Sequence, residues 1–239
     1  MNILAFGAHP DDIEFGCGGG LSAYAKAGHQ VFLFVASRGE YGGDPEVRQK
    51  EQEESARIIG AQEVFWGGYA DTEVPLNREL ISKLEMVIKQ VRPDMIFVNY
   101  FDDTHQDHRN LAQGTLSATR YIPNFLFFEV PTTQNFTPNC YVDIQRVLGK
   151  KLACLEAHRS QVAKTNIRTS PSWRARSPAP TSAGSRGGCG TLRRFSPSGC
   201  SCLFSPDYAR TDASPSPPPS PSRGRGSRLG PLAPGGGEG

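Results

Sequence analysis

Short apolar runs alternate with longer amphipathic stretches through the first two thirds of the chain. Each apolar run has the length of a buried strand, and each amphipathic stretch repeats its apolar residues at helical spacing. Strand and helix in this rhythm are typical of parallel βαβ units, with helices on both faces of one sheet. The pattern predicts helices at 21–27, 45–59, 77–92, 109–119 and 147–158. It predicts strands at 2–6, 30–36, 63–66, 94–98, 125–130 and 140–144.

The predicted fold class is therefore α/β, with a Rossmann-like, doubly wound and mostly parallel sheet. From Arg168 onward the chain changes to Pro, Ser, Arg and Gly, and this part holds 12 of the 19 prolines. Such a composition cannot bury enough apolar surface to build a core. We expect residues 1–166 to form one domain and residues 167–239 to be a disordered low-complexity tail.

Charge divides the chain at the same place. The net charge is +2, but the tail has ten Arg, no Lys and three acids, so the first 167 residues are mildly acidic. The Arg-Gly repeat at 223–226 could attract nucleic acid, but a solvated tail is the simpler interpretation, and we expect no nucleic-acid partner. Arg without Lys, together with Gly, Ala and Pro, is also what GC-rich DNA yields in the wrong reading frame. A frameshift or read-through origin is therefore a hypothesis, which sequencing of the coding DNA tests.

The six cysteines and the N-terminus bear on the compartment. Three cysteines lie in the body and three in the tail, without a CxxC pair, which favours free thiols over a disulfide framework. No apolar run reaches the roughly 18 residues of a membrane span, and the N-terminus has no signal-peptide pattern. We expect a cytoplasmic protein without a membrane span.

Two polar clusters follow predicted strands directly. Residues 7–12, Gly-Ala-His-Pro-Asp-Asp, come after the first strand, and residues 100–108 come after the strand at 94–98. Ligands of open α/β sheets bind at the carboxyl ends of the strands. If these two strands are neighbours, His9, Asp12 and His108 converge there.

Two histidines and one carboxylate, with a fourth position open, are typical of catalytic zinc. A bound metal would lower the pKa of its water toward about 7 and polarise a carbonyl group. Asp11 is then free to act as general base. His105 would act from the other side, with Asp107 as the hydrogen-bond partner that holds it protonated.

The two clusters resemble those of the PIG-L/LmbE family of zinc-dependent de-N-acetylases. Residues 8–12 and 16–19 carry the first part of the resemblance, and His105-Gln106-Asp107-His108 carries the second. Further matches extend the resemblance over about residues 1–166, at 48–51, 92–94, 142–144 and 158–161.

The resemblance implies an LmbE-like domain in which His9, Asp12 and His108 bind Zn²⁺. Fe²⁺ is the alternative ion, and homo-oligomerisation stays open. The resemblance also implies that Asp11 is the general base and that His105 is the acid or electrostatic partner. It also implies sugar contacts from Glu40, Arg48 and Asp71. Family members remove the acetyl group from N-acetylglucosamine conjugates, including the precursors of mycothiol and bacillithiol, so a small amino-sugar conjugate is the expected substrate.

The chain departs from the family after the helix that carries His158. Family members continue with a further helix and a segment that completes the substrate pocket, whereas here low-complexity sequence begins at Ile167. Two alternatives therefore stay open: a sugar- or nucleotide-binding Rossmann-like module without turnover, and an inactive frameshifted product. Hydrolysis needs both Asp11 and His105, whereas a binding module needs neither.

Overall fold

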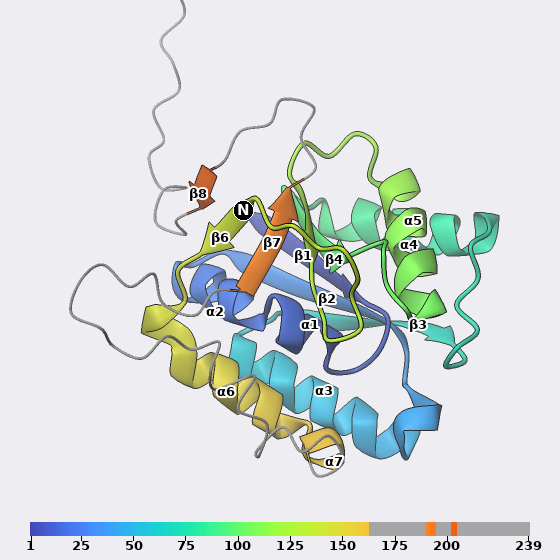
Figure 1. The fold of residues 1–239 in the computed structure, drawn as a ribbon, viewed down its shortest axis with the longest axis horizontal. Coiled ribbons are helices and arrows are strands. Elements are labelled where there is room, and N and C mark those ends of the chain that lie inside the picture. The colour runs from blue at the N-terminus through green and yellow to red at the C-terminus, as the bar shows by residue number, and fades with distance from the viewer. Residues whose placement is uncertain (163–189, 195–201, 205–239) are drawn as a thin grey trace, which may run out of the picture.

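The strands of the protein form a single sheet in the computed structural model, which describes residues 1–162, 190–194 and 202–204 (Figure 1). The order across the sheet is β3-β2-β1-β4-β5-β7-β6-β8. The strands are β1 Asn2–Gly7, β2 Gln30–Ser37, β3 Glu63–Tyr69, β4 Met95–Asn99, β5 Phe125–Phe128, β6 Cys140–Val142, β7 Gly190–Arg194 and β8 Cys202–Phe204.

Strands β1 to β5 are all parallel, and β1 lies at their centre between β2 and β4. Ile3 is in register with Val31 of β2 and with Met95 of β4. Strand β7 is antiparallel to β5 and to β6. The predicted Rossmann-like, mostly parallel α/β fold is confirmed, and the two strands that carry the polar clusters are neighbours.

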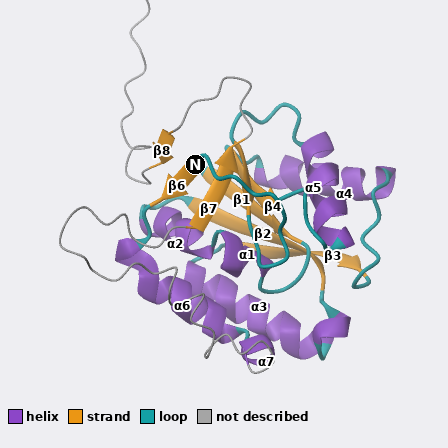
Figure 2. Ribbon diagram, viewed as in Figure 1, coloured by secondary structure: helices purple, strands orange, loops and turns teal. Residues whose placement is uncertain are grey.

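Helices cover both faces of the sheet (Figure 2). Helices α4 and α5 lie on one face, and α1, α2, α3 and α6 lie on the other. The helices are α1 Asp12–Gly16, α2 Gly18–Lys26, α3 Pro45–Ile59, α4 Arg78–Val91, α5 Gln106–Ala118, α6 Leu148–Ala157 and α7 Arg159–Val162, with 3₁₀ turns η1 Glu40–Gly42 and η2 Gln145–Val147.

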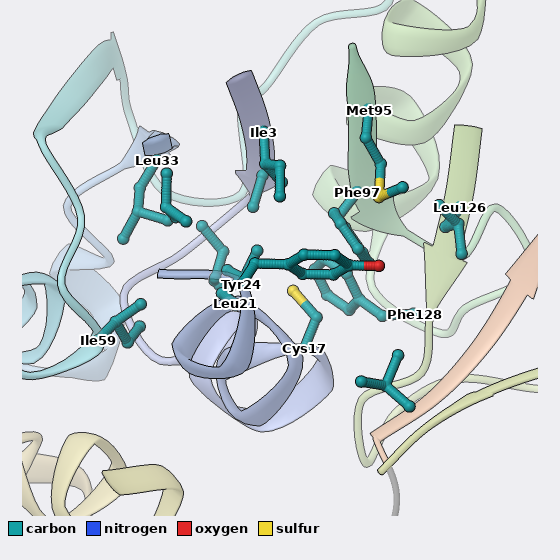
Figure 3. Close-up of a cluster of buried hydrophobic side chains, with 14 of the residues drawn as sticks. Ile3, Cys17, Leu21, Tyr24, Leu33, Ile59, Met95, Phe97, Leu126 and Phe128 are labelled. Carbon is teal, nitrogen blue, oxygen red and sulfur yellow. The ribbon is translucent and has the colours of Figure 1, made fainter. Parts of the chain in front are cut away.

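Alternating strand residues feed two hydrophobic cores, one on each face. In β1, Ile3 and Ala5 pack toward α1, α2 and α3, whereas Leu4 and Phe6 pack toward α4 and α5. Figure 3 shows the first core, in which Tyr24 of α2 reaches beneath the sheet. Successive side chains of a strand point to opposite faces, so a strand covered on both faces must be apolar throughout.

The two longest predicted helices begin at side-chain caps. Asp44 accepts hydrogen bonds from the backbone N–H groups of Glu46 and Val47, and Pro45 is the first helical residue of α3. Asn77 accepts from the N–H of Leu80 at the start of α4. These caps satisfy N–H groups that have no partner within the helix, as the sequence pattern indicates.

Several boundaries differ from the predicted ones. Helix α1 begins within the first polar cluster, and α2 begins at Gly18, so the glycine run lies inside helices rather than before them. Close packing explains this use of glycine, because a Cβ at Gly19 would lie 2.9 Å from the side chain of Ile144. Strands β7 and β8 come from the stretch predicted to be disordered, and the remainder of that tail lies outside the described residues.

Replacement of Gly16 by alanine should destabilise the fold. A Cβ there would lie 2.0 Å from Cδ2 of the buried Phe128. It would also lie too close to Cγ and Cβ of Phe128, which are near the backbone and cannot turn aside as the end of a flexible side chain can. Overpacking of this kind costs about 1–3 kcal/mol, which denaturant unfolding would measure. Gly149→Ala is the matched control, because its Cβ would meet nothing within 4 Å. Equal stability of the two variants would contradict the packing.

Among the described residues, no helix is long and apolar enough to cross a membrane. Cys17 and Cys154 are buried and free, as predicted for cysteines of the body, and Cys140 is buried as well.

Candidate active site

The polar clusters meet at the carboxyl edge of the parallel strands. His9, Asp11 and Asp12 follow β1, and His105 and His108 follow its neighbour β4. The loops after β2 and β3 supply Glu40 and Asp71 to the same edge. Loops of four neighbouring strands therefore surround one point, although the residues are far apart in the sequence.

The three predicted metal ligands lie together in a triangle. Nδ1 of His9 is 3.2 Å from Nε2 of His108, and that nitrogen is 3.2 Å from Oδ2 of Asp12. The third side, from Nδ1 of His9 to Oδ2 of Asp12, is 3.6 Å. Ligand bonds of about 2.1 Å in tetrahedral geometry place donor atoms about 3.4 Å apart. The donor set and its spacing thus fit a zinc-type ion.

Each of these histidines presents its other nitrogen to carboxylates. Nε2 of His9 lies 3.0 Å from both Asp71 and Asp107. Nδ1 of His108 lies 3.2 Å from Asp103. Metal-ligating histidines are commonly oriented by a carboxylate on the nitrogen away from the metal. The triangle therefore has the outer support that a metal centre requires.

The carboxylates also make this a strongly anionic place. Burial alone lowers the pKa of His9, but Asp107, Asp12 and Asp71 outweigh it and raise that pKa to about 11. Burial likewise opposes Asp12 and Asp103 at His108, where the pKa rises to about 9. The carboxylates thus favour positive charge on the two histidine side chains, and a divalent cation bound to the histidine nitrogens could supply that charge in place of protons.

Two other groupings of side chains could also hold a metal. His9, His105 and His108 each offer a ring nitrogen within 4.8 Å of the others. His9, Asp71, His105 and Asp107 form a second grouping by the same criterion. Both share His9 with the predicted triangle, so the region as a whole is rich in ligands.

Asp11 lies beside the triangle in an unusual backbone conformation. Its φ is 94°, in the left-handed region, and its N–H donates to Oε1 of Gln52. Burial, followed by the charge of Asp12, raises the pKa of Asp11 to about 7. Left-handed backbone is costly for most residues other than Gly, Asn and Asp. A carboxyl group held here at this pKa suits a general base.

The predicted contact between the carboxylate of Asp107 and the ring of His105 is not made. Instead, the backbone N–H of Asp107 donates to Nδ1 of His105, which caps helix α5. The carboxylate of Asp107 accepts from His9 and from the N–H groups of Thr72 and Val74. Burial and the two neighbouring histidines lower the pKa of His105, so it is not held in its protonated form.

The three residues expected to contact the sugar are engaged within the protein. Arg48 is buried and donates to the carbonyl oxygens of Gly39 and Pro10. The two carboxylate oxygens of Asp71 meet His9 and the N–H of Tyr41. Glu40 accepts from the N–H of Asp71. In this structure they brace the loops around the triangle.

Asp103 supports His108, a role that the sequence pattern did not assign. Its carboxylate also accepts from Oγ1 of Thr133 and from the N–H of His105. Its position directly after β4, within the second polar cluster, is the signal that could have identified it.

A buried network behind α1 was also missed. Glu14 is fully buried and accepts from Gln52 and Ser55 of α3 at 2.8 Å. Its other oxygen lies 3.5 Å from Nε2 of His158. Two signals in the sequence could have identified this network: a glutamate two residues after Asp12, and the histidine at the start of the matched stretch 158–161. This network fixes α1 and thereby the start of the site.

Replacement of Asp107 by asparagine should weaken metal binding by about 10- to 100-fold. The amide cannot accept from His9, Thr72 and Val74 as the carboxylate does, so His9 loses its orientation. A competition titration with a chromogenic chelator measures the change. Asp102→Asn, in the loop that precedes α5, is the control, since the carboxylate of Asp102 contacts the exposed Asn135. Unchanged zinc affinity in Asp107→Asn would contradict this support role.

Comparison with known proteins agrees with the geometry. Residues 4–119 match the PIG-L family, described as GlcNAc-PI de-N-acetylase. The Escherichia coli K12 protein "uncharacterized deacetylase YaiS" is 35% identical over 167 residues, covering 66% of this chain and 90% of that protein. The diacetylchitobiose deacetylase of Thermococcus kodakarensis is 28% identical over 187 residues, covering 66% and 69%.

A solved structure shows the same fold. The N,N'-diacetylchitobiose deacetylase of Pyrococcus horikoshii superposes with a TM-score of 0.65 at 24% identity, covering 81% of this chain and 83% of that one. The fold, the two polar clusters at adjacent strand ends and the identity to a deacetylase over most of its length agree. The chain belongs to the PIG-L/LmbE family of deacetylases.

Proposed function

We propose that this protein is a metal-dependent hydrolase that removes the N-acetyl group from an N-acetylglucosamine-type conjugate. The observation that carries the proposal is the triangle of His9, Asp12 and His108 with Asp11 beside it. The deacetylases among its relatives support the reaction class, and the diacetylchitobiose deacetylase supports an amino-sugar substrate.

The triangle would hold Zn²⁺, with Fe²⁺ as the alternative ion. Such an ion, when bound, polarises an amide carbonyl and lowers the pKa of a coordinated water. The two histidines and Asp12 leave room for that chemistry, because three protein ligands keep a fourth position open.

Asp11 would accept a proton from the water that attacks the acetamide carbon. The water oxygen bonds to that carbon, the C–N bond breaks, and the sugar amine receives the proton. Acetate and a free amine are the products. A carboxyl group with a pKa near 7 can both take and return a proton at neutral pH.

His105 would stabilise the oxygen of the attacked carbonyl group. The N–H of Asp107 points at Nδ1 of His105, so the neutral ring carries its hydrogen on Nε2. A fixed N–H donor aimed at developing negative charge is worth about 2.7–4 kcal/mol in comparable sites. In this role His105 acts as a neutral ring, whereas the sequence led us to expect a protonated ring.

An acetate-release assay tests the proposal. Zinc-loaded and iron-loaded protein would be incubated with N-acetylglucosaminyl malate and with diacetylchitobiose, and acetate and free amine would be quantified. We expect equal amounts of both products from at least one substrate. Sugar binding without acetate release would instead support a binding module. If the protein neither bound sugar nor released acetate, the result would contradict the proposed reaction.

A further inference from the structure

We propose that Tyr41 is a substrate-binding residue that packs on a second sugar ring next to the N-acetylglucosamine. The inference deepens the proposed function and rests on it. Tyr41 lies in turn η1, after β2, at the same sheet edge as the metal triangle. Its exposed fraction is 80%, so the ring is open to contact with a ligand.

The backbone that carries Tyr41 is fixed from several sides. Arg48 donates to the carbonyl oxygen of Gly39 at 2.7 Å, and Gln161 donates to that of Gly42 at 3.0 Å. Gly39 has a left-handed φ of 68°, and a Cβ there would lie 1.9 Å from Nη1 of Arg48. An exposed loop held by two long side chains is built to keep one position.

Asp71 links this loop to the metal triangle. One carboxylate oxygen accepts the N–H of Tyr41 at 3.0 Å, and the other lies 3.0 Å from Nε2 of His9. The N–H of Asp71 in turn donates to the carboxylate of Glu40. Tyr41 is thus two hydrogen bonds from a predicted metal ligand, at the exposed rim rather than within the triangle.

The chemistry of an exposed ring on a fixed backbone favours a sugar. An aromatic face offers a large apolar contact, and the phenol oxygen offers one hydrogen bond. Pyranose rings present apolar C–H faces and hydroxyl groups together. A fixed platform also avoids the entropy of ordering a loop on binding. Because Tyr41 stands outside the triangle, it would contact the substrate beyond the acetamide.

The chain offers a matched control in Tyr121. This tyrosine is 89% exposed, but it precedes β5 and therefore lies at the amino edge, away from the site. Arg120 lies over its ring at 5.7 Å. Neither tyrosine is part of the core, so replacing either should leave folding intact.

The test compares kcat/KM for diacetylchitobiose and for N-acetylglucosamine. Tyr41→Ala should lower the preference for the disaccharide about tenfold, mainly through KM, and Tyr41→Trp should retain it. Tyr121→Ala should leave kcat/KM unchanged for both substrates. Equal losses on both substrates, or no loss with Tyr41→Ala, would overturn the inference.

A binding measurement separates this inference from the proposed reaction. Calorimetric titration of diacetylchitobiose into Asp11→Asn, with and without Tyr41→Ala, should show about tenfold weaker binding in the double variant. If the wild type binds the disaccharide through Tyr41 but releases no acetate, the reaction is wrong and the inference stands. If acetate is released and Tyr41→Ala binds as well as its parent, only the inference fails. Absence of both binding and release would overturn both.

Discussion

Replacing Asp11 with asparagine is expected to lower acetate release by about 10²- to 10⁴-fold while the protein keeps its metal. Asparagine has the same shape and tolerates the left-handed φ of 94° at this position, so the backbone should not change. It cannot take a proton from water. A steady-state assay, combined with metal analysis of the same sample, measures both effects.

The matched control for Asp11 is Asp44, which caps α3 and lies outside the triangle. Asp44→Asn keeps a good cap and should release acetate as the wild type does. Full activity in Asp11→Asn would contradict the role of Asp11. Loss of metal together with activity would show that Asp11 supports the ion rather than the proton transfer.

The second large effect concerns the ligands themselves. His108→Ala should reduce zinc affinity by more than about 100-fold, beyond the range typical of outer partners, and abolish acetate release. It removes one corner of the triangle and leaves Asp12 and Asp103 without their shared partner. Equilibrium dialysis against zinc, followed by elemental analysis, measures the loss.

His105→Ala is the informative comparison for His108→Ala. His105 lies within 4.8 Å of His9 and His108, so it belongs to an alternative ligand grouping. We expect His105→Ala to keep its zinc and to lose activity. If His105→Ala loses zinc and His108→Ala retains it, the assignment of ligands is wrong.

The sequence predicted which residues meet at the sheet edge where one rule covered their placement. Apolar runs identify β1 and β4. Because strands joined by helices in βαβ units run parallel, the residues that follow both strands lie at one edge of the sheet. The convergence of His9, Asp12 and His108 follows once these strands are neighbours, as they are. The fold class was predictable for the same reason, since buried parallel strands are apolar throughout.

Contacts within the site were not predictable in the same way. Asp107 was assigned to His105 because they are two residues apart, yet its carboxylate faces His9, 98 residues away in sequence. The difference arises because the loop after β3 brings the N–H groups of Thr72 and Val74 to that carboxylate. Loop paths of this kind depend on packing rather than on local spacing.

The loop residues show the same limit. Arg48, at the start of α3, is compatible with a solvated helical face or with a sugar contact by sequence alone. In the structure it is buried, and its guanidinium joins the loop after β1 to the loop after β2. Its role depends on carbonyl groups, Pro10 O and Gly39 O, which carry no sequence signal.

The most direct test of the central claim is anomalous diffraction at the zinc edge from crystals of the zinc-loaded protein. We expect one strong anomalous peak that marks the zinc ion. It should lie about 2.0–2.2 Å from Nδ1 of His9, a carboxylate oxygen of Asp12 and Nε2 of His108. A peak held instead by His9, Asp71, His105 and Asp107, or no peak near His9, would contradict the assignment.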